Sequence, residues 1–226
     1  MKKAILLRAA LAPVAALFAL AAPTASFADD PYIQNNGRCG LDTGYYVKPT
    51  TRVELDFELL QAVNDDGADW YILDERSMDG TTAVNTHFFN FYFVKSSGNP
   101  ANKFGWSCVA PASSTSGAYQ GTGVSGDTER HLAVIDAKQG KGLFYTGSSL
   151  VKEHSFTRVF TTPVPGNTLK LFGRYNFSGN SFPKAKIYGF KIYEYTNETD
   201  RVLVHDYVPA VKPVRVNDLR RALGVQ

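Results

Sequence analysis

The segment Lys184-Ala-Lys-Ile-Tyr-Gly-Phe-Lys-Ile-Tyr-Glu194, followed by Val202-Leu-Val-His-Asp-Tyr-Val-Pro209, decides the fold of this chain. In both stretches, every second side chain is expected on the same face, and a single face of the first stretch is mostly apolar. This period of two is typical of β-strands, and the polar run Tyr195–Arg201 between the stretches is typical of a turn. The segment therefore predicts a hairpin within a β-sandwich, and it contains no obvious catalytic group.

The same period continues toward the N-terminus. Thr51–Leu60 alternates strictly between apolar and polar residues, and Asn64-Asp65-Asp66-Gly67 is a turn sequence. Further strands are expected at 70–73, 88–94, 131–136, 141–145, 155–160 and 168–174. The stretch Ser96–Gly126, rich in Ser, Gly, Pro and Ala, predicts long loops. Many short strands without a long helical period indicate an all-β fold, an antiparallel sandwich or barrel.

The first 28 residues resemble a targeting segment. Lys2, Lys3 and Arg8 precede the apolar run Ala9–Ala22, and Ser26-Phe27-Ala28 is a small-x-small cleavage site. We therefore expect cleavage after Ala28, secretion or a periplasmic location, and no integral membrane segment in the mature chain.

Three segments of the chain follow from this. Residues 1–28 form the expected signal peptide, residues 29–209 one sandwich domain, and residues 210–226 a short tail. Within the tail, Asn217 can cap a short helix over 218–223 that stops at Gly224.

The charge balance gives no reason to expect nucleic-acid binding. The whole chain has 24 basic and 21 acidic residues, and the first 28 residues hold three of the basic ones and none of the acidic ones. The mature chain therefore has equal numbers of both signs, without the basic excess of nucleic-acid-binding domains.

Cys39 and Cys108 are the only cysteines of the chain. An even pair in an oxidising compartment is consistent with a disulfide, and two buried free thiols are the alternative. Both interpretations stay open at this point. Two cysteines without a histidine cluster make a poor metal site.

Several segments together resemble one family. The chain is similar to the concanavalin A-like, laminin-G-like jelly-roll domains of secreted bacterial proteins, from about Tyr32 to Pro209. The segments that carry the resemblance are Tyr32–Gln34, Gly40–Tyr45, Thr51–Phe57, Leu171–Gly173, Ile187–Tyr193 and Val204–Pro209. The resemblance implies an antiparallel β-sandwich and a role in carbohydrate binding, adhesion or cell-surface interaction, although a fold alone does not establish a function.

Glu54, Asp56 and Glu58 suggest an enzymatic alternative. Glucanases of the laminarinase type, which have a similar fold, carry a Glu-x-Asp-x-Glu strand in which the two glutamates are nucleophile and acid/base. The alternation places the three carboxylates of this chain on one face, as such a mechanism requires. Any solvated antiparallel strand shows the same alternation, and the motif lies early in the chain, so the sequence favours a solvated face.

An acidic turn offers a second alternative, a calcium site. Asp65, Asp66 and Asp69 could together supply oxygen ligands to Ca²⁺, as loops at the rim of some laminin-G-like domains do. The Asn-Asp-Asp-Gly sequence is first of all a turn signal, so we expect no cofactor, with Ca²⁺ as the alternative.

Aromatic side chains are the remaining candidates for a binding surface, because sugar-binding faces use exposed aromatic rings as platforms. The candidates lie near turns or in aromatic-rich strands, and they are Trp70, Tyr71, Tyr92, Trp106, Tyr119 and Tyr175. Since jelly-roll cores also use many aromatic residues, one or two of them are expected at a real site. The sequence as a whole favours a secreted, non-catalytic module that binds a glycan or another cell-surface component, with a glycoside hydrolase or a protein-binding envelope protein as alternatives.

Overall fold

The computed structural model describes residues 30–37, 40–62, 70–76, 88–93, 103–109, 120–156, 168–173, 183–207 and 214–215. Within these ranges all regular structure is β-strand, which confirms the all-β class. The strands are β1 Ile33–Asn36, β2 Leu41–Asp42, β3 Thr51–Leu59, β4 Trp70–Arg76, β5 Phe88–Phe93, β6 Lys103–Val109, β7 Gln120–Ser125, β8 Arg130–Asp136, β9 Lys141–Thr146, β10 Ser149–Ser155, β11 Lys170–Leu171, β12 Lys184–Tyr195, β13 Arg201–Asp206 and β14 Val214–Arg215.

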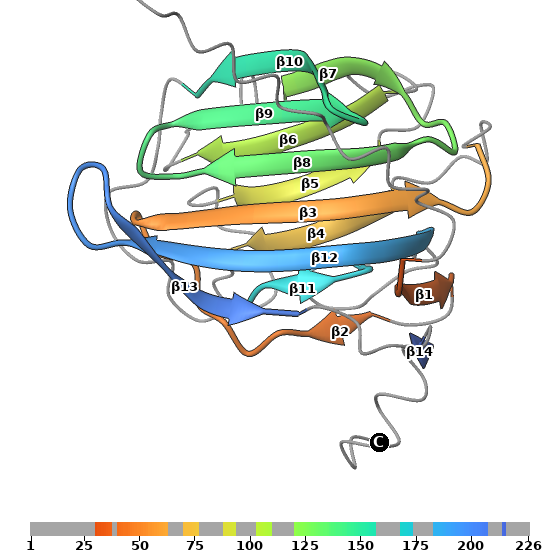
Figure 1. The fold of residues 1–226 in the computed structure, drawn as a ribbon, viewed down its shortest axis with the longest axis horizontal. Coiled ribbons are helices and arrows are strands. Elements are labelled where there is room, and N and C mark those ends of the chain that lie inside the picture. The colour runs from red at the N-terminus through yellow and green to blue at the C-terminus, as the bar shows by residue number, and fades with distance from the viewer. Residues whose placement is uncertain are drawn as a thin grey trace, which may run out of the picture.

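The strands form two sheets packed face to face. Sheet A has eight strands in the order β10-β9-β8-β3-β12-β1-β14, with β13 also paired to β12, and sheet B has six in the order β2-β11-β4-β5-β6-β7. Neighbouring strands are antiparallel except for the short parallel pair β1–β14. Figure 1 looks onto sheet A, with the strands of sheet B behind it. This is the expected β-sandwich.

Strand β3 shows how the sequence pattern builds the core. Thr51, Val53, Leu55, Phe57 and Leu59 are each at most 1% exposed, and the polar residues between them are partly exposed. One face of β3 therefore packs against sheet B while the other points outward, as the strict alternation predicts.

Aromatic rings fill the space between the sheets. The ring of Phe57 lies 5.3 Å from that of Phe91 and 5.4 Å from that of Phe104, both edge-on. Phe144 of β9 stacks on Phe91 at 5.8 Å. Edge-to-face and offset stacked pairs of this kind add about 0.5–1.5 kcal/mol each to the gain from burial.

The hairpin expected on either side of Tyr195–Arg201 is present. Strands β12 and β13 pair in antiparallel fashion, and the polar turn between them is held by Asn197, whose side-chain oxygen accepts from the backbone N–H groups of Thr199 and Asp200. Strand β13 is exposed along its whole length, including Val202, Leu203 and Val204. The second strand of the expected hairpin is therefore exposed to solvent on both faces.

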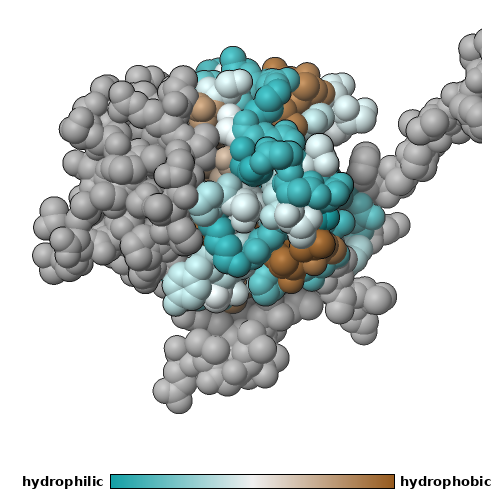
Figure 2. Space-filling model, turned by 90° about the vertical axis from the view of Figure 1, so that its left-hand side faces the viewer, coloured by the Kyte–Doolittle hydropathy of each residue, from teal (hydrophilic) through white to brown (hydrophobic). Residues whose placement is uncertain are grey.

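Further exposed apolar side chains belong to β10, where Leu150 and Val151 are 48% and 46% exposed. Strand β10 is the edge strand of sheet A on the side opposite β13. Figure 2 views the molecule from the end of the sandwich, and the brown, apolar areas there are separated by hydrophilic surface.

Two sequence predictions about strands are only partly correct. The stretch Ser96–Gly126, expected to form long loops, contains strands β6 and β7. In β6, Phe104, Trp106 and Cys108 lie in the core, with one glycine and one serine between them. Of the strand expected at 155–160, Ser155 is the last residue of β10, which begins at Ser149 and pairs with β9, and residues 157–160 lie outside the described residues.

Other expectations fall outside the described residues. They are the signal peptide at 1–28, most of the tail at 210–226 including its expected helix, the acidic turn at 64–67, and Asp69. In the portion of the chain that the structure describes, no helix is long and apolar enough to cross a membrane.

Candidate functional site

A β-bulge in β12 shapes the outer face of sheet A. Ile187 pairs with Phe57 and Gly189 pairs with Asp56, so Tyr188 is an extra residue in β12. Bulges re-aim side chains and are frequent next to functional sites. Here the bulge places two consecutive residues, Tyr188 and Gly189, on the outer face.

Because of the bulge, the simple alternation expected for this strand is wrong beyond Ile187. Ile187 lies in the core, but the next core residues are Phe190 and Ile192 rather than Gly189 and Lys191. The apolar positions change phase at the bulge, and Gly189 and Lys191 point outward instead.

A groove lies where the glycine leaves the face open. It has a volume of about 290 Å³ and is lined by Glu54, Asp56, Leu132, Tyr188, Gly189 and Lys191. A wider depression of about 460 Å³ adjoins it, sharing Asp56 and Leu132 and continuing over Glu129, Arg130, His131, Thr146 and Gly147. We call the first of these hollows the Gly189 groove.

The three carboxylates of β3 line the outer face as predicted, and each is held by a cation. Arg130 donates to both oxygens of Asp56, at 2.8 and 2.7 Å. Arg52 donates to Glu54 through Nε and Nη2, at 2.9 and 2.8 Å. These charge-assisted contacts hold the carboxylate groups in place before any ligand arrives.

Glu58, the third carboxylate, is held by two residues of β12. It accepts from Lys186 Nζ at 2.8 Å and from the hydroxyl of Tyr188 at 2.7 Å. Partial burial raises the pKa of Glu58, but these hydrogen bonds and the charges of Lys186 and Arg130 outweigh it, so the pKa lies below its ordinary value of 4.5. Glu58 is therefore a carboxylate held in its charged form.

Arg130 links the carboxylates to the bulge. Its guanidinium lies 4.0 Å from the centre of the Tyr188 ring, and its Nη1 donates to Asp30 at 2.5 Å. Burial alone would lower the pKa of Arg130, but the hydrogen bonds to Asp56 and Asp30 raise it above the ordinary value. The Tyr188 side chain is thus held between Glu58 and Arg130.

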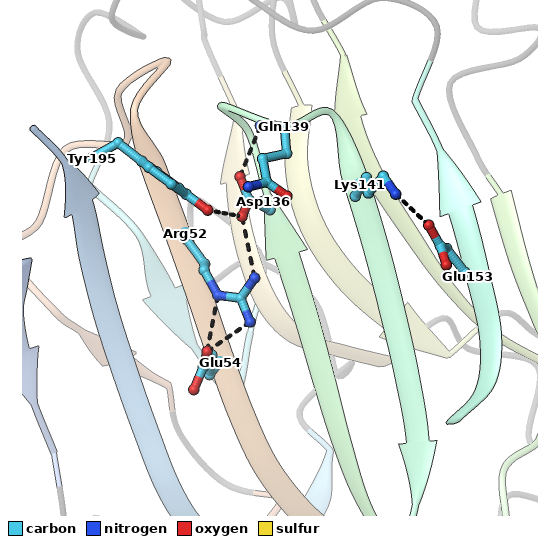
Figure 3. Close-up of polar contacts among 7 residues, drawn as sticks. All are labelled: Arg52, Glu54, Asp136, Gln139, Lys141, Glu153 and Tyr195. Atoms are coloured by element: carbon cyan, nitrogen blue, oxygen red, sulfur yellow. Dashed lines mark hydrogen bonds and ion pairs between the residues drawn. The ribbon is translucent and has the colours of Figure 1, made fainter. Parts of the chain in front are cut away.

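A second polar network braces the same face at its other end (Figure 3). Asp136, 1% exposed, accepts from Arg52 at 3.2 Å and from the Tyr195 hydroxyl at 2.7 Å. Its other oxygen accepts from the backbone N–H of Gln139 at 2.9 Å, in the turn between β8 and β9. This network ties β3, β8 and β12 together beside the Gly189 groove.

His131 lies under the wider depression and is 1% exposed. Its Nε2 lies 2.7 Å from Asp127 Oδ1 and its Nδ1 lies 3.1 Å from Thr146 Oγ1, while its ring packs on Phe144 at 4.9 Å. Because both ring nitrogens are already engaged, this histidine supports the scaffold.

Lys191 differs from the other cations of this face. Among the residues that the structure describes, its ammonium has no ion pair or hydrogen bond, whereas Arg52, Arg130 and Lys186 each hold a carboxylate. It stands directly opposite Glu54 in the ladder between β12 and β3. Lys191 is therefore the cation of the groove that is available to a ligand.

Most of the aromatic candidates do not form an exposed platform. Trp70 and Tyr71 are each 4% exposed, Tyr92 is 3% exposed, and Trp106 is completely buried. Trp70 and Trp106 belong to the main core, and Tyr71 stacks on Tyr92 at 5.5 Å on the other face of sheet B. Rings buried in this way cannot stack on a sugar. Tyr119 and Tyr175 lie outside the described residues.

A polar row crosses sheet B next to the two stacked tyrosines. Ser107, Asn90, Asp74 and Lys170 stand opposite one another on four neighbouring strands, and the first three are completely buried. Asn90 donates to Asp74 at 3.3 Å. Since these side chains are buried, the row offers no open surface comparable to the Gly189 groove.

The metal and disulfide predictions stay predictions. Asp65, Asp66 and Asp69 lie outside the described residues, and within the described ranges no three His, Cys, Asp or Glu side chains are grouped to hold a metal ion. Cys108 is buried, and burial and the charge of Asp136 raise the pKa of its thiol. Its pairing with Cys39 stays a prediction, because Cys39 lies outside the described residues.

The sequence interpretation missed the residues that shape the groove. Tyr188, Gly189 and Lys191 were expected to be strand residues only, Leu132 was expected only as part of the strand at 131–136, and Arg130 was not singled out. The available signal was the change of phase between Ile187 and Phe190, because two apolar core residues three positions apart in a strand require a bulge between them.

Comparisons with known proteins assign no role to any residue of this chain. No protein-family model and no curated protein matches the chain. Among solved structures it is similar to the CBM40 module of the Ruminococcus gnavus IT-sialidase bound to α2,3-sialyllactose, with a TM-score of 0.46 and 10% identity over 74% of this chain and 92% of that one. It is also similar to the native heptameric SAP-like pentraxin of Limulus polyphemus, with a TM-score of 0.44 and 12% identity over 75% of this chain and 76% of that one. Because identities this low carry no residue roles, the function has to be inferred from the residues of this chain.

Proposed function

We propose that the protein is a non-catalytic glycan-binding module and that the Gly189 groove is its binding site. One observation carries the proposal: the bulge at Tyr188 places Gly189 opposite Asp56 and leaves a groove among polar groups that are already fixed. Binding sites with few, precisely held polar groups bind at a lower cost in conformational entropy.

The chemistry of the lining suits a sugar. A saccharide presents many hydroxyl groups and an apolar ring face, so its site needs acceptors, donors and some apolar surface. Glu54 and Asp56 offer acceptors, Lys191 offers donors, and Leu132 and Tyr188 supply apolar surface.

The electrostatics of Glu58 support binding rather than catalysis. The acid/base residue of a retaining glycosidase needs a raised pKa, so that it is protonated when it meets the glycosidic oxygen. The contacts with Lys186 and Tyr188 instead lower the pKa of Glu58. We therefore propose that Glu54, Asp56 and Glu58 act as fixed acceptors and braces, and that the protein is not an enzyme.

The proposed place of action is outside the cytoplasm. The basic, apolar and small-residue segments of residues 1–28 have the order of a signal peptide, with cleavage after Ala28. A secreted or periplasmic module would meet glycans or other cell-surface components there.

A glycan array with a blocking variant tests the proposal. An added Cβ at Gly189 would have only Asp56 Cβ within 4 Å, at 3.8 Å, so Gly189→Leu can fill the groove without a clash at the Cβ. We expect the wild type to bind at least one glycan, and Gly189→Leu to lose at least tenfold in affinity for it with an unchanged melting temperature.

Lys152→Met is the matched control, because Lys152 is exposed on β10 and outside the groove lining. Equal binding by wild type and Gly189→Leu would exclude the groove as the site. An array without any bound glycan would contradict the proposed function and favour the protein-binding alternative. Release of reducing sugar from β-glucans by the wild type, but not by Glu58→Gln, would favour the hydrolase.

A further inference from the structure

Most cations around the Gly189 groove already form ion pairs with carboxylates of the protein. Arg130 holds Asp56 and Asp30, and Arg52 holds Glu54 together with the buried Asp136. Sites that select carboxylates, sulfates or phosphates use free, bidentate donors, above all arginine. Here both guanidinium groups already serve carboxylates of the protein itself.

The carboxylate oxygens of Glu54 and Asp56, in contrast, can accept further hydrogen bonds. Glu54 receives its contacts from Arg52 on Oε1, and its Oε2 has no hydrogen bond to any described residue. Each oxygen of Asp56 accepts one N–H from Arg130, and a carboxylate oxygen can accept about two hydrogen bonds. The groove therefore offers carboxylate oxygens to which the hydroxyl groups of a ligand would donate.

The sign of the local charge points the same way. Glu54 and Asp56 line the groove itself, and Glu129 and Arg130 line the adjoining depression that shares Asp56 with it. Because Arg130 and Arg52 each face two carboxylates, the negative charges around the groove outnumber the positive ones. An anionic ligand would be placed beside these carboxylates with Lys191 as its one available cation among the described groove residues. Juxtaposed like charges at a partly desolvated site are a strong element of discrimination.

We infer that the Gly189 groove selects neutral saccharides, with Glu54 and Asp56 accepting from hydroxyl groups, and that it disfavours sugars carrying a carboxylate, sulfate or phosphate. This inference rests on the proposed function and adds the class of ligand. Glu54 is the residue that sets the discrimination, since its Oε2 is free to accept and its charge stands directly opposite Lys191.

The test compares one sugar with and without an acidic group, for example lactose and sialyllactose, or a neutral glycan bound on the array and its carboxylated form. Titration calorimetry on the full chain should give at least tenfold weaker binding of the acidic form. In Glu54→Gln this ratio should fall several-fold, because the substitution keeps the shape of the side chain and removes its charge. Added salt should also reduce the ratio for the wild type.

Glu153→Gln is the control, since Glu153 pairs with Lys141 on β9 and β10 and does not line the groove. It should leave the ratio unchanged. Tighter binding of the acidic sugar, or an unchanged ratio in Glu54→Gln, would overturn the inference while the proposed function stands. Binding of neither form and of no array glycan would overturn the proposed function itself.

Discussion

At the scale of single residues, two glycines of sheet A have opposite reasons to be glycine. A Cβ at Gly142 would lie 2.9 Å from Trp106 Cε2 and 3.1 Å from Phe156 Cζ, both in the packed core. A Cβ at Gly189 would have its nearest neighbour at 3.8 Å. Gly142 makes room for an indole ring inside the protein, whereas Gly189 leaves room on its surface.

This contrast predicts different stabilities for two equal substitutions. Gly142→Ala should destabilise the protein by about 1–3 kcal/mol, because the core cannot take up an extra methyl group without a shift of Trp106. Gly189→Ala should change the free energy of unfolding by less than about 0.5 kcal/mol. Urea denaturation of both variants measures this, and equal values would show that Trp106 does not pack on Gly142 as described.

Residue patterns alone could predict only some of the site. The alternation over Thr51–Leu60 correctly placed Glu54, Asp56 and Glu58 on one face. The choice of aromatic candidates failed for Trp70 and Trp106, because an aromatic side chain near a turn has the same pattern whether it faces solvent or core. Burial depends on the partner sheet, which local sequence does not contain.

At the scale of strands, β3 and β12 are joined on the outer face by side chains as well as by the ladder. Glu58 of β3 accepts from both Lys186 and Tyr188 of β12, and Tyr188 is also the bulge residue and part of the groove lining. The contacts need an ionised Glu58, so the joint between the strands depends on pH.

The sign of this dependence follows from the lowered pKa of Glu58. A carboxyl group whose pKa is lower in the folded than in the unfolded state stabilises the fold above its ordinary pKa, here 4.5, and loses this contribution as pH falls through the folded value. Between pH 7 and pH 3 the wild type should therefore lose more stability than Glu58→Gln. Urea denaturation at several pH values measures the difference, and parallel curves for the two proteins would contradict it.

The hairpin β12–β13 and the strand β3 were predictable because strict alternation and polar turns are local signals. In the sequence, the bulge was visible only as a change of phase in the apolar residues of β12. Strand β10 was not predictable from periodicity, because its consecutive exposed residues show no period of two. Strands β6 and β7 were hidden by the serine- and glycine-rich composition around them. In each case pairing with a neighbouring strand, rather than local preference, sets the element.

At the scale of the whole molecule, the core and the proposed binding surface lie on opposite faces of sheet A. The facing sides of both sheets form one aromatic core, and the stacked tyrosines and polar row on the other side of sheet B are buried. The outer side of sheet A carries the Gly189 groove, its fixed carboxylates and Lys191. A central strand bulge thus turns an ordinary solvated sheet face into a shaped surface.

The location of the bound glycan tests the proposed site most directly. Backbone amide chemical shifts should be recorded by NMR while the strongest neutral glycan from the array is titrated into the wild type. We predict that the largest changes fall on β12 from Tyr188 to Lys191 and on β3 and β8 around Asp56 and Leu132, and that they vanish in Gly189→Leu. Changes centred on sheet B or on β13, with the groove residues unaffected, would contradict the proposed site.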